Sequence, residues 1–148
     1  MDYNQHIKTT FHKAFFDLLE QKVSEEPPDY EWITRLYAEI KEKLLALLAK
    51  DSPLAKEIDE KLDVALFKQM IEHNVFDSND FYNLICYVFE LILKLGAPAR
   101  DNEVLERKSK VLEGKTFATI VPLFIKHVNE AIDLIYEDLH TIKKNLVR

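Results

Sequence analysis

The chain has 148 residues, a length that predicts one domain with a hydrophobic core of its own. It contains 2 glycines and 5 prolines, so tight turns are scarce and the composition favours long helices. The glycines, Gly96 and Gly114, stand apart, which excludes the glycine-rich phosphate loops of P-loop and dinucleotide-binding enzymes. The net charge of −6 opposes non-specific binding to nucleic acid, which relies on many lysines and arginines.

The expected compartment is the reducing cytoplasm. The single cysteine, Cys86, cannot form an internal disulfide, and the first residues lack the basic and apolar pattern of a signal peptide. The most apolar run, residues 84–95, is 12 residues long and contains Glu90 and Lys94. This run is too short and too charged to cross a bilayer, so we expect no membrane span.

Two helices are predicted at the start of the chain. Apolar residues at helical spacing indicate the first over residues 3–23. Pro28 marks the end of the connection that follows, because residues before a proline disfavour the α conformation. Asp29 is then expected to cap a second helix that extends to about Lys50.

Three helices are predicted in the middle of the chain. Ser52 precedes a proline and Asp63 precedes an apolar run, so each is expected to cap a short helix. The third begins at Asp77 or Ser78 and stops at Gly96. It is apolar on most sides, and we expect it to lie at the centre of the bundle. The expected bounds are residues 54–62, 64–73 and 78–95.

The remaining chain predicts a polar helix and then a long one. Asp101 is expected to cap the polar helix, which stops at Gly114. The long helix covers residues 116–146, with Pro122 in or near its first turns, where the helix either starts or kinks. The predicted fold is therefore all-α: residues 1–148 form a single bundle of six or seven helices with a long C-terminal helix.

Few residues have the spacing of a chemical site. Glu137 and His140 match one half of a di-iron motif, but the sequence holds no second Glu-x-x-His pair. The acidic residues at 57–63 alternate with lysines, as on a solvated helix face, and Cys86 has apolar neighbours. We expect no metal, no cofactor and no enzyme. The alternative is a metal-dependent or hydrolytic helical enzyme whose site assembles from scattered Glu and His residues.

Several stretches, in consistent order and spacing, resemble the t-complex protein 11 family. The most specific covers residues 95–104, Leu-Gly-Ala-Pro-Ala-Arg-Asp-Asn-Glu-Val, where family members typically read Leu-Cys-Ala-Pro-Val-Arg-Asp-Glu-Glu-Val. The chain resembles the N-terminal part of the family's helical domain, in a minimal or truncated version. The other matching stretches are residues 12–17, 27–30, 57–63 and 131–139.

The resemblance implies a cytoplasmic regulatory or scaffolding module that binds protein partners. The family is all-helical and is not known for enzymes, and its animal members are linked to sperm function through cyclic-AMP and protein kinase A signalling. Kinase-pathway components are therefore the expected partners. The shared motif residues are candidate partner contacts, but the residues themselves favour a structural role as a loop, a cap and a helix junction. At that junction Arg100 either pairs with a carboxylate or caps free carbonyl groups. These candidates are Pro28, Asp29, Tyr30, Pro98, Arg100 and Asp101.

The end of the long helix bears on self-association. Its apolar positions continue at three- and four-residue spacing as far as Ile142 and Leu146. We expect these two residues to fold back onto the first helix, which gives a monomer. The alternative is that the helix extends beyond the bundle. A second copy, in a weak dimer, or the remainder of a longer family-like protein would then cover the two residues.

Overall fold

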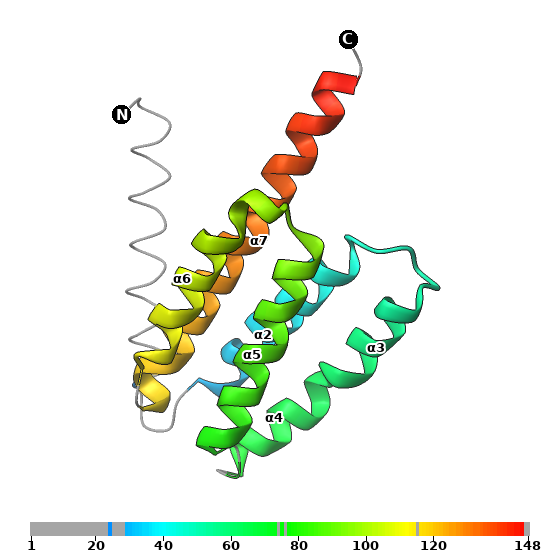
Figure 1. Ribbon diagram of the computed structural model, residues 1–148. Coiled ribbons are helices and arrows are strands. Elements are labelled where there is room, and N and C mark those ends of the chain that lie inside the picture. Colours follow the sequence, from blue (N-terminus) through cyan, green and yellow to red (C-terminus); the bar gives the residue numbers. More distant parts are fainter. Residues whose placement is uncertain (1–23, 25–28, 74, 76, 115, 147–148) are drawn as a thin grey trace.

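A computed structural model describes residues 24, 29–73, 75, 77–114 and 116–146. In these ranges the chain is helical and contains no strand, so the all-α prediction is confirmed (Figure 1). The helix predicted at 3–23, and Pro28, lie outside the described residues. The elements are α2 (Tyr30–Leu45), α3 (Pro53–Lys61), α4 (Val64–Glu72), α5 (Ser78–Leu95), the 3-10 helix η1 (Pro98–Arg100), α6 (Asp101–Leu112) and α7 (Phe117–Leu146).

Side-chain caps start four of these helices, as the sequence predicts. Asp29 accepts a hydrogen bond from the backbone N–H of Trp32 at 3.1 Å and thereby starts α2. The Ser52 hydroxyl accepts a hydrogen bond from the backbone N–H of Ala55 at 3.2 Å and starts α3. The Asp63 carboxylate accepts one from the backbone N–H of Leu66 at 3.0 Å and starts α4. Asp77 starts α5 with a reciprocal capping box.

Two expected boundaries are wrong. The second helix ends at Leu45 instead of Lys50, because the chain tightens into turns bonded three residues apart, such as Leu47 N–H to the Leu44 carbonyl at 3.2 Å. Asp101 does not cap α6 but is its first residue. Helical structure begins earlier, at Pro98, whose fixed φ favours the 3-10 turn that leads directly into α6.

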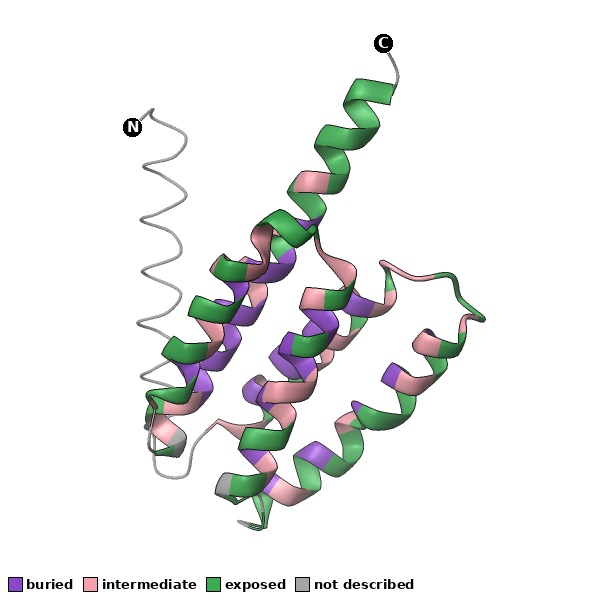
Figure 2. Ribbon diagram, viewed as in Figure 1, coloured by how far each residue is buried: buried purple, intermediate pink, exposed green. Residues whose placement is uncertain are grey.

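The helix α7 contains Pro122 within its first turns and continues through it. Its last turns project beyond the other helices and are exposed along their length (Figure 2). Ile142 and Leu146 are 56% and 79% exposed, so they do not pack against the described helices, and their packing on the first helix stays a prediction. Their expected partner, the helix at 3–23, lies outside the described residues.

The helices pack in two groups on either side of α5 (Figure 1). Helix α2 packs against α3, α4 and α7, whereas α5 packs against α6 and α7. Each of these helices contributes buried residues (Figure 2), and these residues form a hydrophobic core cluster. Phe89 of α5 is fully buried, which agrees with the central position predicted for this helix. None of the described helices combines the length and the apolar composition that a bilayer crossing requires.

Candidate functional site

The motif residues at the start of α6 form an interhelical ion pair. Arg100 donates to both carboxylate oxygens of Asp138 on α7, from Nε at 3.2 Å and Nη2 at 3.0 Å. Its Nη1 donates to Glu103 at 3.3 Å. Hydrogen bonds from Arg100 hold the pKa of the Asp138 carboxyl below its usual range. The sequence-based expectation that Arg100 pairs with a carboxylate is confirmed, and the pair joins α6 to α7.

A second polar cluster lies further along the same two helices. Arg107 of α6 hydrogen-bonds Glu130 of α7, and its Nη1 lies 3.2 Å from Nδ1 of His127. Because arginine can only donate, this nitrogen of His127 accepts and the ring is neutral. His127 is 6% exposed, and burial, assisted by the Arg107 charge, lowers its pKa to about 4. Sequence reasoning missed this cluster; its only signal is the helical spacing of charged residues on each helix.

The remaining motif candidates lie apart from this junction. Asp29 caps α2, and the Tyr30 carbonyl accepts from the Thr34 hydroxyl at 2.7 Å. Figure 1 places the start of α2 and the η1 turn toward opposite ends of the molecule. The candidates that the structure describes therefore do not assemble into one site. Those in the described residues serve as caps, turns and ion pairs of the fold.

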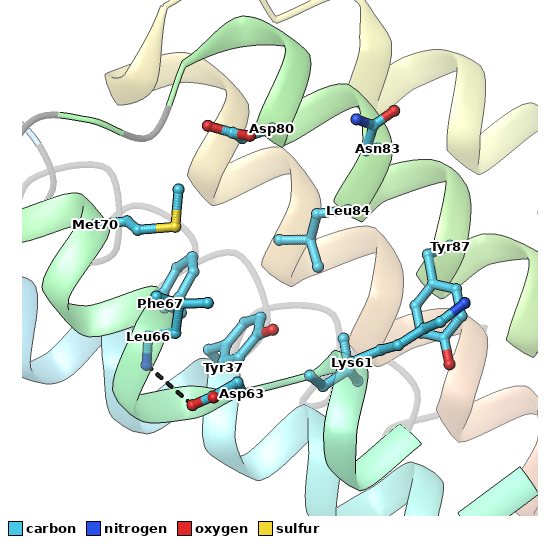
Figure 3. Close-up of a pocket in the computed structure, with 11 residues that line it drawn as sticks. Tyr37, Lys61, Asp63, Leu66, Phe67, Met70, Asp80, Asn83, Leu84 and Tyr87 are labelled. Carbon is cyan, nitrogen blue, oxygen red and sulfur yellow. Dashed lines mark hydrogen bonds between the residues drawn. The ribbon is translucent and has the colours of Figure 1, made fainter. Parts of the chain in front are cut away.

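A groove of about 360 Å³ lies between the α3–α4 pair and α5 (Figure 3). Helix α2 forms its floor through Tyr37. Its apolar lining comes from Leu66, Phe67 and Met70 of α4 and from Leu84 and Tyr87 of α5. Its polar rim consists of Lys61, Asp63, Asp80 and Asn83.

Tyr37 is the polar residue at the base of this groove. Its ring stacks on Phe67, with centroids 4.1 Å apart and planes 8° from parallel. The side chain is 6% exposed, and within the described part of the chain no group hydrogen-bonds its hydroxyl. Burial, with the Asp63 charge, raises the pKa of Tyr37 far above its usual value. The hydroxyl therefore stays protonated and is available to donate.

The end of the groove near α3 is closed by a small polar network. The Tyr87 hydroxyl donates to Glu57 at 3.1 Å, and Lys61 Nζ lies 5.0 Å from the centre of the Tyr87 ring. Burial and the bond to Glu57 raise the pKa of Tyr87 to about 12. Lys61 also lies 3.9 Å from Glu57. Its charge is thus engaged within the fold.

The groove is suited to binding by apolar contact. Neither histidine nor cysteine occurs among its described lining residues. No three His, Cys, Asp or Glu side chains in the described ranges lie together in a way that could hold a metal ion. Glu137 and His140 are both exposed on the projecting part of α7, and Cys86 is half-buried in α5. The acidic stretch at 57–63 contributes Glu57 to the polar network and Asp63 to the rim.

The fold and this groove define an all-helical protein with an open, largely apolar groove. The family model for T-complex protein 11 matches residues 2–143. This match covers nearly the whole chain, and the chain belongs to the T-complex protein 11 family. The family assignment made from the sequence is confirmed.

The curated relatives carry the same family name. The human T-complex protein 11 homolog is 40% identical over 99 residues, which cover 66% of this chain and 19% of that protein. Human T-complex protein 11-like X-linked protein 1 is 35% identical over 94 residues, or 63% of this chain and 18% of that protein. Mouse T-complex protein 11 is 36% identical over 99 residues, which cover 66% of this chain and 17% of that protein. The chain thus spans about a fifth of the length of these relatives. No solved structure matches it.

Replacing Arg100 tests whether this motif residue is structural. We expect Arg100→Ala and Arg100→Lys both to lower the urea midpoint of unfolding, because lysine cannot reproduce the two-pronged contact with Asp138. Arg35→Ala, at an exposed position of α2, is the control and leaves the midpoint unchanged. Unchanged stability of both Arg100 variants, with weakened partner binding, would instead make Arg100 a partner contact.

The buried His127 predicts a specific pH dependence of stability. The unfolded state takes up a proton near pH 6.5, whereas the folded state takes it up only near pH 4. Stability is therefore complete above about pH 6.5 and falls as the pH drops toward 4, by roughly 2–3 kcal/mol. His127→Gln, measured by urea denaturation across this range, should flatten the dependence, whereas the exposed His73→Gln should not. Identical curves for wild type and His127→Gln contradict this assignment.

Proposed function

We propose that this chain is a non-enzymatic helical module that binds a protein partner in the groove between α4 and α5. The observation that carries the proposal is the exposed apolar surface at the groove. Leu66 is 51% exposed at its edge, and apolar side chains line the space beside it. Apolar surface gathered at a recess and rimmed by polar groups is typical of an interaction site.

The polar groups of the groove favour recognition over reaction. Its hydroxyls belong to Tyr37 and Tyr87, whose raised pKa values keep both protonated near neutral pH. A phenol with a raised pKa is a poor nucleophile and a poor general base. These groups support hydrogen bonding to a partner, and no feature of the groove favours the alternative of a hydrolytic enzyme.

We propose further that the partner belongs to cyclic-AMP and protein kinase A signalling, in the cytoplasm. This part of the proposal rests on membership of the T-complex protein 11 family, whose animal members are linked to that pathway. We propose a monomer as the binding unit.

The test is capture of purified kinase subunits by the immobilised chain. We expect wild type to retain the regulatory or the catalytic subunit of protein kinase A, and Leu66→Gln to retain at least tenfold less, because it removes an apolar contact at the groove. Leu105→Gln is the matched control, since Leu105 is similarly exposed but lies on α6, and it should bind as wild type does.

Two results would contradict the proposal in different ways. Equal capture by wild type and Leu66→Gln would remove the groove as the binding surface. Capture of neither subunit by the wild-type chain would remove the named pathway, and the identity of the partner would then have to come from another class of regulator.

A further inference from the structure

The shape of the groove suits a helix. Its walls are two helices, α4 and α5, and its floor is a third, α2. On the α5 side, Asp80, Leu84 and Tyr87 follow at spacings of four and three, so they share one face over about two turns, or roughly 10 Å. An open channel of this kind accepts the apolar face of an amphipathic helix, whose anchors recur at the same spacing.

The apolar lining offers contacts for such anchors. Leu66 is exposed at the edge, while Met70 and Leu84 are half-buried and lie on opposite walls (Figure 3). Methionine is flexible and polarisable, so Met70 adapts to anchors of different shape. The stacked Tyr37 and Phe67 rings form a rigid base beneath them. A ligand that covers these side chains would remove apolar surface from water.

The rim carries unbalanced negative charge. Asp63 and Asp80 each accept a hydrogen bond from a backbone N–H, at 3.0 and 3.1 Å, but neither forms an ion pair with any residue that the structure describes. Lys61, the cation of the lining, lies beside Glu57 and over the Tyr87 ring. Two carboxylates therefore face the groove without a matching cation, and charge complementarity favours a ligand that carries lysine or arginine.

The Tyr37 hydroxyl adds a directional contact. It belongs to a side chain that is more than nine-tenths buried, and it points into the space bounded by Leu84 and Lys61 (Figure 3). Among the described residues no group hydrogen-bonds this hydroxyl, and its oxygen is not one of the fully buried atoms left without a partner, so it is open to the groove. It is therefore placed to donate to an acceptor oxygen of a bound molecule.

We propose, as a deepening of the proposed function and resting on it, that the groove binds a basic amphipathic helix of a partner protein. The apolar face of that helix covers Leu66, Met70 and Leu84. A lysine or arginine beside this face pairs with Asp63 or Asp80, and the Tyr37 hydroxyl donates to an acceptor oxygen on the same helix.

The test uses two fluorescently labelled synthetic helical peptides of about 15 residues, a length at which isolated helices become stable. Both carry leucine at the apolar positions, and they differ in having lysine or glutamate at the polar positions. Anisotropy titration with the full chain should show the lysine peptide binding at least tenfold more tightly. Leu66→Gln should weaken its binding, whereas Leu105→Gln should not.

Charge-neutral variants distinguish the effect of the rim carboxylates on peptide binding from the effect of the net negative charge of the chain. Asp63→Asn with Asp80→Asn keeps an oxygen that accepts the backbone N–H but removes both charges, and it should weaken lysine-peptide binding at least fivefold. Asp133→Asn with Glu137→Gln removes two exposed charges of α7 and is the matched control. Equal losses in the two double variants would overturn the proposal, because attraction to net charge alone would then explain the binding.

Tyr37→Phe keeps the stacked ring and removes the hydroxyl alone. We expect its urea midpoint to match wild type and its affinity for the lysine peptide to fall roughly threefold to tenfold, the scale of one hydrogen bond. Tyr82→Phe, at an exposed position of α5, should change neither. Unchanged affinity of Tyr37→Phe would overturn the role of the hydroxyl.

The remaining outcomes distinguish this inference from the proposed function. If both peptides bind equally and Leu66→Gln weakens both, the groove binds proteins but does not select a basic helix. If Leu66→Gln leaves peptide binding unchanged, the groove is not the binding surface and both proposals fail. If only the glutamate peptide binds, the sign of the charge selection is the reverse of the one inferred here.

Discussion

The stacking of Tyr37 on Phe67 determines where α4 lies. The two rings are 4.1 Å apart and nearly parallel, and they hold α4 against α2. Helix α5, by contrast, packs against α6 and α7. Because each wall of the groove is held by a different set of helices, the space between α4 and α5 stays open. The groove is thus a consequence of which helix each wall packs against.

The other side of the molecule is fixed by polar contacts. Arg100 pairs with Asp138, and Arg107 pairs with Glu130, so α6 and α7 are joined at two levels. Tyr136 of α7 donates its hydroxyl to the Lys43 carbonyl at 2.7 Å and so links α7 to α2. These contacts give the strongest sequence motif of the family a structural role. The proposed binding surface lies elsewhere, and only its edge at Lys61 and Asp63 falls within a matching stretch, residues 57–63.

Local features of the fold were predictable from the sequence, and long-range ones were not. A capping hydrogen bond joins residues three positions apart, so Asp29 and Asp63 indicate the starts of α2 and α4 from the sequence alone. The prediction that Asp101 caps α6 was wrong because Pro98 starts the helical turn earlier. The partner of Arg100 lies 38 residues away, and no spacing rule identifies Asp138. Tyr37 and Leu84 line the same groove because three helices pack together there. Hydrophobic periodicity predicts each helix but not how the helices pack.

The position of α4, and with it one wall of the groove, depends on the Tyr37–Phe67 stack that holds α4 on α2. A double-mutant cycle with Tyr37→Leu, Phe67→Leu and the combined variant measures this directly, through the free energies of unfolding in urea. The account predicts a coupling energy of about 0.5–1.5 kcal/mol between the two rings, the range for stacked aromatic pairs. Strictly additive losses, with no coupling, would contradict it and would mean that other contacts place the wall of the groove.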